Sequence, residues 1–462
     1  MSGCEYFVRE RSIAGSTNAR MRSRAVGAAP PRPDHHKPFM TSAPSATHPR
    51  FFGVCVVRAA FVLAVFGWGV GFYGPPIYLH AVIERTGWPL TLVSAAVTLH
   101  YLCGAVVIVN LPRLYARMGV PATIVTGAVV TAAGVCGWAI ALHPWQLFMA
   151  ALFSGMGWVA MGAVAVNAVV SPWHVRTRPT ALAKAYNGAS IGGVIFSPLW
   201  VALIACFGFG AAAAAVGAVM ILAMALLARN VFARTPESMG QRPDGDTTSL
   251  SALDVPVGER TPMPGAFLWR DRAFQTLAIG MAIGLFAQIG LLAHLFSLLV
   301  PALGAQMAGL AMGGATACAI LGRTVAARLM SRIGDRRMVA AAGYAVQATG
   351  SMALLMANPG QIGMILLGVV LFGSGIGNAT SLPPLIAQTD FAPRDVSRVV
   401  ALIVAIGQAT YAFAPALFGV LLAASGTGGD FGVGGRSVGF FALAAFIQLA
   451  AAGSFLAGRR KR

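Results

Sequence analysis

Hydrophobic residues occur along most of this chain in long runs that charged residues interrupt mainly at the ends. Each run is about as long as the roughly 20 helical residues that cross a bilayer. The runs lie at residues 54–80, 90–112, 121–142, 145–170, 180–206, 209–228, 273–300, 303–327, 338–357, 360–386, 397–424 and 437–457. Turn-forming residues such as Gly87-Trp88-Pro89 and Asn358-Pro359-Gly360 separate neighbouring runs. The pattern predicts an all-α membrane protein with twelve transmembrane helices.

Polar stretches divide these runs into two groups. Residues 1–53 are rich in Arg, Ser, Pro and Ala without apolar periodicity, which predicts a disordered cytoplasmic tail. Met1, Met21 and Met40 are all candidate start residues in it. Residues 229–272 hold several prolines and carboxylates, which predicts a cytoplasmic linker. We therefore expect an N-terminal six-helix bundle at 54–228, a C-terminal six-helix bundle at 273–457 and a basic cytoplasmic tail at 458–462.

Composition supports a membrane protein, because 57% of the 462 residues are hydrophobic and only 10% are charged. The net charge of +19 could suggest a nucleic-acid partner, but no interleaved basic and aromatic surface is present. With the N-terminus inside, all 33 Lys and Arg residues except Arg85 and Arg436 fall on the cytoplasmic side. This distribution predicts a multi-pass protein of the cell inner membrane with both termini cytoplasmic, no nucleic-acid partner and the lipid bilayer as its surroundings.

The sequence offers no candidate for catalysis or metal binding. The six cysteines form no CxxC pair, and the His35-His36 pair lies in the tail without a further ligand nearby. No HExxH motif and no phosphate-binding glycine loop occurs. We expect no enzymatic activity, no metal, no cofactor and a monomeric protein.

Two short patterns repeat in the two halves. Arg-Leu-x-x-Arg-x-Gly occurs at residues 113–119 and again at 328–334, where a membrane helix ends and a basic turn follows. Residues 152–157 resemble residues 371–377 in the fourth and tenth runs. Two parallel repeats of six helices are the architecture of the major facilitator superfamily, which the chain resembles from about residue 54 to 457.

The basic turns are similar to the gating motif of that family, G-x-L-x-D-R-x-G-R, although Ala116 and Ser331 stand where the motif has Asp. The resemblance implies that these turns bias a cytoplasmic gate. The gating candidates are Arg113, Arg117, Gly119, Arg328, Arg332, Gly334 and Asp335.

Arg323 lies 11 residues before Gly334, so its Cα is about 16 Å deeper in the membrane than the turn. A guanidinium at that depth is costly unless it faces water, a partner or an anion. Met312, Thr316 and Ala319 share its helical face and are small enough to line a cavity. The Gly322-Arg323 pair resembles the eighth span of the monocarboxylate and oxalate–formate branch, where the matching arginine is implicated in binding substrate carboxylate. The alternative is that Arg323 extends to the interface as one more positive-inside charge.

Other polar side chains in the runs are candidates for the same site. None of the 14 Asp and Glu residues falls in the middle of a run, which favours an anion over a cation as cargo. The further substrate-binding candidates are Tyr73, Asn187, Gln288, Asn378, Gln408 and Tyr411. His100 and His294 are candidates for proton coupling. Each of these side chains could instead make a packing hydrogen bond between helices.

These observations predict a secondary active transporter that moves a small organic anion, a mono- or dicarboxylate, by alternating access with proton symport or anion exchange. One alternative is an efflux transporter for a hydrophobic compound or drug, and another is a non-transporting membrane sensor on the same fold. Glycines and prolines predict breaks in three spans, at Gly74-Pro75-Pro76, at Pro198 and at Pro415.

Overall fold

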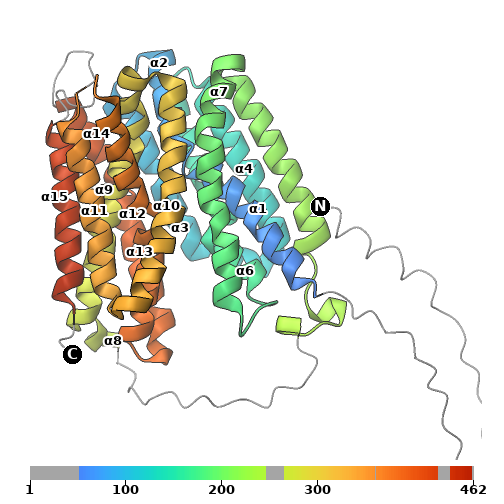
Figure 1. The fold of residues 1–462 in the computed structure, drawn as a ribbon. Helices are drawn as coiled ribbons and strands as arrows, with labels where there is room; N and C mark the ends of the chain where they lie inside the picture. Colours follow the sequence, from blue (N-terminus) through green and yellow to red (C-terminus); the bar gives the residue numbers. More distant parts are fainter. Residues whose placement is uncertain (1–50, 246–264, 359, 425–437, 460–462) are drawn as a thin grey trace, which may run out of the picture.

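The computed structural model describes residues 51–245, 265–358, 360–424 and 438–459, which are predominantly helical (Figure 1). The tail before residue 51, the linker centre at 246–264 and the last three residues, for which the sequence predicts cytoplasmic segments, lie outside the described residues. The helices before the linker are α1 (Gly53–Gly71), α2 (Pro75–Thr86), α3 (Leu90–Met118), α4 (Val120–Ile140), α5 (Pro144–Trp158), α6 (Ala163–Val170) and α7 (Arg178–Leu227). Those after it are α8 (Gly265–Leu268), α9 (Arg272–Leu303), α10 (Ala305–Ile333), α11 (Arg336–Met356), α12 (Ile362–Asp390), α13 (Pro393–Tyr411), α14 (Ala414–Ala424) and α15 (Val438–Ala457).

Eleven helical segments in the described part of the chain are long and apolar enough to cross a membrane. One of them, Arg178–Phe232, contains the non-helical residue Gly208 (φ 77°, ψ 161°), a conformation that favours glycine. The segment reverses there, so that the two parts of α7 run in opposite directions (Figure 1). The twelve predicted crossings are therefore present, two of them in one segment.

Two of the three predicted breaks occur. The first span is interrupted between α1 and α2, where Pro75 begins the new helix at a position that needs no backbone N–H. The eleventh is interrupted between α13 and α14, just before Pro415. The break predicted at Pro198 is wrong, because α7 continues through that residue.

The helices form an N-terminal bundle (α1–α7) and a C-terminal bundle (α9–α15) (Figure 1). We call the side on which α9 begins the linker side and the side on which α7 reverses the far side. Contacts between the bundles join α7 to α10, α3 to α14 and α2 to α9.

Buried apolar side chains show where the bundles meet. A large cluster takes in both bundles, and its C-terminal members, such as Phe296, Met312 and Phe418, come from the far-side halves of their helices. A second cluster, which includes Phe274 and Ile386, lies wholly within the linker-side half of the C-terminal bundle. Among the described residues, buried apolar side chains therefore join the two bundles on the far side, whereas the linker-side cluster of the C-terminal bundle does not reach the other bundle.

The last residues of the predicted tail pack against the N-terminal bundle. Phe51 and Phe52 contact the ring of Trp173, with centroids 6.2 and 5.4 Å apart, so residues 51–53 belong to the bundle and not to the predicted tail.

The start of the linker packs against the same bundle. Asp244 accepts backbone N–H bonds from residues 175, 176 and 177 at 3.1, 2.8 and 3.2 Å. Partial burial by itself raises the pKa of Asp244, but bonds from the Thr177 hydroxyl and these N–H groups outweigh it and lower the pKa to about 2.

Candidate functional site

Arg323 projects from α10 toward the N-terminal bundle. Its side chain is half-buried, and its Nη2 donates a hydrogen bond to the Ser190 hydroxyl on α7. Gly377 on α12 lies against the same side chain, since a Cβ at that position would be 2.8 Å from both Cγ and Nε of Arg323. The guanidinium thus reaches a neighbour in the other bundle, and a glycine leaves room for it.

No ion pair found among the described residues includes Arg323. A guanidinium has five N–H donors, and the Ser190 hydroxyl is a neutral acceptor. The positive charge of Arg323 therefore has no carboxylate counterion in the described part of the protein.

Tyr73 and Thr316 lie against the next turn of α7. A Cβ added to Gly193, one turn from Ser190 on α7, would lie 2.8 Å from Tyr73 Cε2 and 2.7 Å from Thr316 Cγ2. Tyr73 is near enough to Arg323 for the two side chains to interact electrostatically. Tyr73 and Thr316 therefore meet at Gly193 where the two bundles touch, one helical turn along α7 from the hydrogen bond between Arg323 and Ser190.

The face of α10 that carries Arg323 is more tightly packed than expected. Met312, Thr316 and Ala319 are each at most 1% exposed, because α10 packs closely against its neighbouring helices over this length. The expectation that these three side chains line an open cavity is wrong.

The remaining substrate-binding candidates are more scattered. Asn378 lies next to Gly377 and donates a long bond, 3.4 Å, to the Gly322 carbonyl. Tyr411 meets the ring edge of Tyr101 across the bundles, with centroids 5.8 Å apart. Asn187 is exposed on α7, three residues from Ser190.

Two glutamines among these candidates are buried within the C-terminal bundle. Gln288 accepts a hydrogen bond from the Gln347 side-chain amide at 2.9 Å, which joins α9 to α11. Gln408 is 9% exposed, and its Nε2 has no partner among the described residues. The structure thus groups Tyr73 and Asn378 near Arg323 and places Gln288 in helix packing.

The two candidate histidines are buried in different surroundings. The ring nitrogens of His100 lie 2.9 Å from the Ser154 hydroxyl and 2.9 Å from the Gly71 carbonyl, and the ring stacks on Trp158. His294 Nε2 lies 3.0 Å from the Pro415 carbonyl, while Nδ1 has no partner among the described residues. Both ring nitrogens of His100 are therefore already engaged in helix packing.

The predicted gating arginines lie on helix ends at the linker side. Arg117, Arg328 and Arg332 are exposed, and Arg113 is exposed with a 3.1 Å bond to Asn110. The basic segment remains helical to Ile333, so the turn itself is confined to Gly334 and Asp335. Gly119 and Gly334 end α3 and α10 with φ of 78° and 72°.

Asp335 has two functions in the local structure that its position outside the gating motif did not indicate. It caps α11 by accepting the backbone N–H groups of Arg337 and Met338, and Arg459 donates to it at 2.6 Å. Partial burial alone raises the pKa of Asp335, but these hydrogen bonds and the Arg459 charge lower it below its ordinary value. Asp335 thus ties the end of α15 to the start of α11.

Arg337 is a buried polar centre that sequence reasoning missed. It is 3% exposed and donates to Asp390 Oδ2 at 2.7 Å, to Thr276 Oγ1 at 3.0 Å and to the Ala273 carbonyl at 2.7 Å. Arg337 lies in the same run of basic residues as the exposed gating arginines, so the sequence did not distinguish it from them. The signal that could have identified it is Asp390, the carboxylate at the end of the tenth span.

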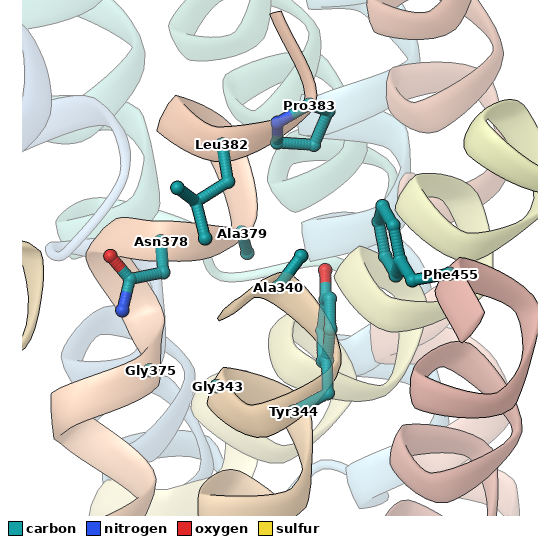
Figure 2. A pocket seen from close by; sticks show the side chains of 9 residues that line it. All are labelled: Ala340, Gly343, Tyr344, Gly375, Asn378, Ala379, Leu382, Pro383 and Phe455. Carbon is teal, nitrogen blue, oxygen red and sulfur yellow. The ribbon is translucent and has the colours of Figure 1, made fainter. Parts of the chain in front are cut away.

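A small pocket lies inside the C-terminal bundle between α11, α12 and α15 (Figure 2). The rings of Tyr344 and Phe455 stack beside it, with centroids 5.7 Å apart, and the Asn378 side chain points away from them (Figure 2). Tyr344 Oη and Asn378 Oδ1 have no hydrogen-bond partner among the described residues. The lining residues all belong to the C-terminal bundle, and one of them, Asn378, is next to Gly377, which lies against the Arg323 side chain.

The fold agrees with those of solved transporters. The nucleoside transporter NupG has a TM-score of 0.65 at 13% identity, over 89% of this chain and 100% of that chain. A bacterial homolog to the human lysosomal transporter Spinster, in an inward-facing and occupied conformation, has a TM-score of 0.63 at 15% identity, over 89% and 99% of the two chains. At these identities the likeness shows the fold alone.

Sequence comparison gives the family. The MFS transporter asaE of Aspergillus flavus is 31% identical over 134 residues, which cover 29% of this chain and only 30% of that relative. The family model described as Major Facilitator Superfamily matches residues 59–415, most of the chain. These matches indicate a transporter and not an enzyme, and the chain belongs to the Major Facilitator Superfamily.

Proposed function

We propose that this protein is a secondary active transporter for a small organic anion, a mono- or dicarboxylate, and that Arg323 binds the carboxylate. The observation on which the proposal depends is the half-buried guanidinium between the bundles, whose one described hydrogen bond goes to the neutral Ser190 hydroxyl. An anion would supply the missing counterion, and a carboxylate matches the planar fork of donors.

The surroundings of Arg323 also argue against a cationic cargo. The carboxylates of the described spans lie at helix ends, as Glu84, Asp390 and Asp395 do, and not beside Arg323. A cationic cargo would meet an uncompensated positive charge at this depth. Tyr73 and Asn378, whose polar groups lie close by, are the candidates for binding the rest of the anion.

Between the two coupling modes, the arrangement favours anion exchange over proton symport. With no anion bound, closing both bundles around Arg323 would leave its charge desolvated and unpaired, which is costly. A bound carboxylate removes that cost, so the loaded carrier reorients more easily than the empty one. His100, whose ring nitrogens both have partners, is poorly placed to carry a coupling proton.

The positive-inside distribution supports insertion in the cell inner membrane with both termini and the linker side in the cytoplasm. In that orientation the exposed arginines 113, 117, 328 and 332 would lie at the cytoplasmic headgroups. Together with the glycine turns they would bias the cytoplasmic gate, as the resemblance to the family motif implies.

The test is uptake of labelled lactate, pyruvate and oxalate into proteoliposomes, preloaded with the unlabelled acid or empty. Arg323→Ala should lower transport of the accepted acid about 100-fold, because two charge-assisted hydrogen bonds are lost. Arg323→Lys should retain part of the activity, since it keeps the charge without the fork. Arg394→Ala, an exposed arginine at the start of α13 and outside the gating turns, is the matched control and should behave as the parent.

Equal transport by Arg323→Ala and the parent would exclude the proposed role. A labelled nucleoside and a hydrophobic dye serve as further cargo classes, because the solved relatives include a nucleoside transporter. Transport of the nucleoside or the dye, without transport of any of the acids, would assign the cargo to that other class of compound. Transport of none of these compounds would favour a sensor. Faster uptake into preloaded than into empty vesicles is the result expected of exchange.

A further inference from the structure

The far-side contact between α3 and α14 contains a hydrogen bond between the two bundles. Thr98 Oγ1 accepts the backbone N–H of Ala416 at 2.9 Å. Ala416 is in the first turn of α14, where backbone N–H groups have no partner within their own helix. The interruption between α13 and α14 thus frees a donor, and a side chain of the opposite bundle satisfies it.

One helical turn away, the same two helices approach each other more closely. Gly419 follows Ala416 by three residues, and Ser94 precedes Thr98 by four. A Cβ added to Gly419 would lie 2.5 Å from Ser94 Oγ and 2.7 Å from Ser94 Cβ, far inside a normal contact. A glycine at 419 is therefore required for this approach as long as Ser94 has a side chain.

Two polar atoms beside this contact have no partner among the described residues. Ser94 Oγ comes from the N-terminal bundle and His294 Nδ1 from the C-terminal bundle, and both side chains are fully buried. His294 also lies against the Gly419 position, with Cε1 3.4 Å from the added Cβ. Water would satisfy both atoms if the helices separated, so these groups oppose closure while the Thr98 bond and the apolar packing favour it.

We infer that Ser94 and Thr98 on α3, with Ala416 and Gly419 on α14, form a latch that holds the far side of the transporter closed. The latch must open whenever cargo enters or leaves on the far side. Its strength is limited, because one hydrogen bond and one close helix contact work against two unpaired polar groups. The inference is independent of the cargo and needs only the alternating access of a transporter.

A cysteine at Val201 reports on closure without touching the latch. Val201 is 5% exposed on α7 and faces Gly309 of α10 across the bundles. In protein whose native cysteines are replaced by alanine, the alkylation rate of Val201→Cys in detergent measures how often the far side opens. Thr98→Val, which has the same shape but no acceptor, should raise this rate about five-fold, the effect expected for one net hydrogen bond. Thr98→Ser keeps the hydroxyl and should stay near the parent rate.

The close helix contact gives a second test that does not depend on the hydrogen bond. Gly419→Ala should raise the alkylation rate, because the new Cβ collides with Ser94. Adding Ser94→Gly removes both colliding atoms and should restore the parent rate. Adding Ser94→Ala instead leaves the Cβ collision at 2.7 Å and should not restore it.

The latch is refuted if Thr98→Val and Thr98→Ser react alike, or if Ser94→Gly and Ser94→Ala rescue Gly419→Ala equally. Tryptophan-fluorescence unfolding of each variant identifies any that is misfolded. Because the two tests use different variants, a misfolded variant in one test leaves the other test able to refute the latch.

Discussion

Arg337 provides the strongest test of how the linker-side half of the C-terminal bundle is held together. Its guanidinium joins the first turn of α11 to the last residue of α12 and to two residues near the start of α9. Replacing it with alanine would remove three hydrogen bonds at once and leave Asp390 without its described cation. We predict that Arg337→Ala destabilises the protein far more than loss of any exposed arginine.

The size of the effect follows from burial. Removing one partner of a buried ion pair costs about 3–5 kcal/mol. The Arg337 side chain is 4% exposed, but Asp390 is 19% exposed, so water can partly solvate the freed carboxylate. We therefore expect the lower end of the range, about 3 kcal/mol. In the Asp390→Asn background the same substitution should cost less, with a coupling energy of about 1–2 kcal/mol.

The measurement is unfolding in mixed micelles by titration with sodium dodecyl sulfate, followed by tryptophan fluorescence. Arg332→Ala is the matched control, because it removes an equal charge from an exposed position nearby and should change stability by less than about 0.5 kcal/mol. If Arg337→Ala unfolds at the same midpoint as Arg332→Ala, the reasoning about this buried centre is wrong.

Two further predictions concern groups outside the proposed substrate contact. The folded-state pKa of Asp244 is about 2, below the ordinary 3.8, so its stabilisation is present above about pH 4 and is lost as pH falls toward 2. Asp244→Asn should therefore unfold more easily than the parent at pH 7, and the difference in stability between the two proteins should shrink near pH 2. A difference that stays constant with pH would contradict the capping role. His100→Ala should lower stability by about 3 kcal/mol, since it loses two hydrogen bonds and the stack on Trp158, and should leave the pH profile of transport unchanged. A flattened profile would instead make His100 a proton carrier.

The membrane spans could be predicted from the sequence because lipid admits only segments that satisfy their own backbone hydrogen bonds. The ends of the spans were less predictable. The apolar runs ending at residues 112 and 327 continue as helix to Met118 and Ile333. Hydropathy marks where side chains become polar, whereas a helix ends where its hydrogen bonds end, and exposed arginines such as Arg328 tolerate helical geometry well.

The depth of Arg323 followed from its spacing to Gly334, but its partners did not. Ser190 and Gly377 lie on other helices, and their approach depends on how α7, α10 and α12 pack. No local pattern in the sequence records that packing. For the same reason the two interpretations of His100 stayed open until the partners of its ring nitrogens, Ser154 and Gly71, were known.

The packing of α10 is a case in which the prediction from the sequence was wrong. Small side chains along the face of Arg323 suggested an open cavity, yet small residues also allow helices to approach closely in membranes. Thr316 and Ala319 do the latter here. Composition alone does not separate these two uses.

Equilibrium binding of labelled lactate, pyruvate and oxalate to the purified protein tests the proposed role of Arg323 most directly, because it needs neither orientation nor coupling. We predict that the parent and Arg394→Ala bind at least one of these acids saturably, and that Arg323→Ala loses the binding. Binding of the same acid by Arg323→Ala with the affinity of the parent would contradict the assignment of Arg323 as the carboxylate-binding residue.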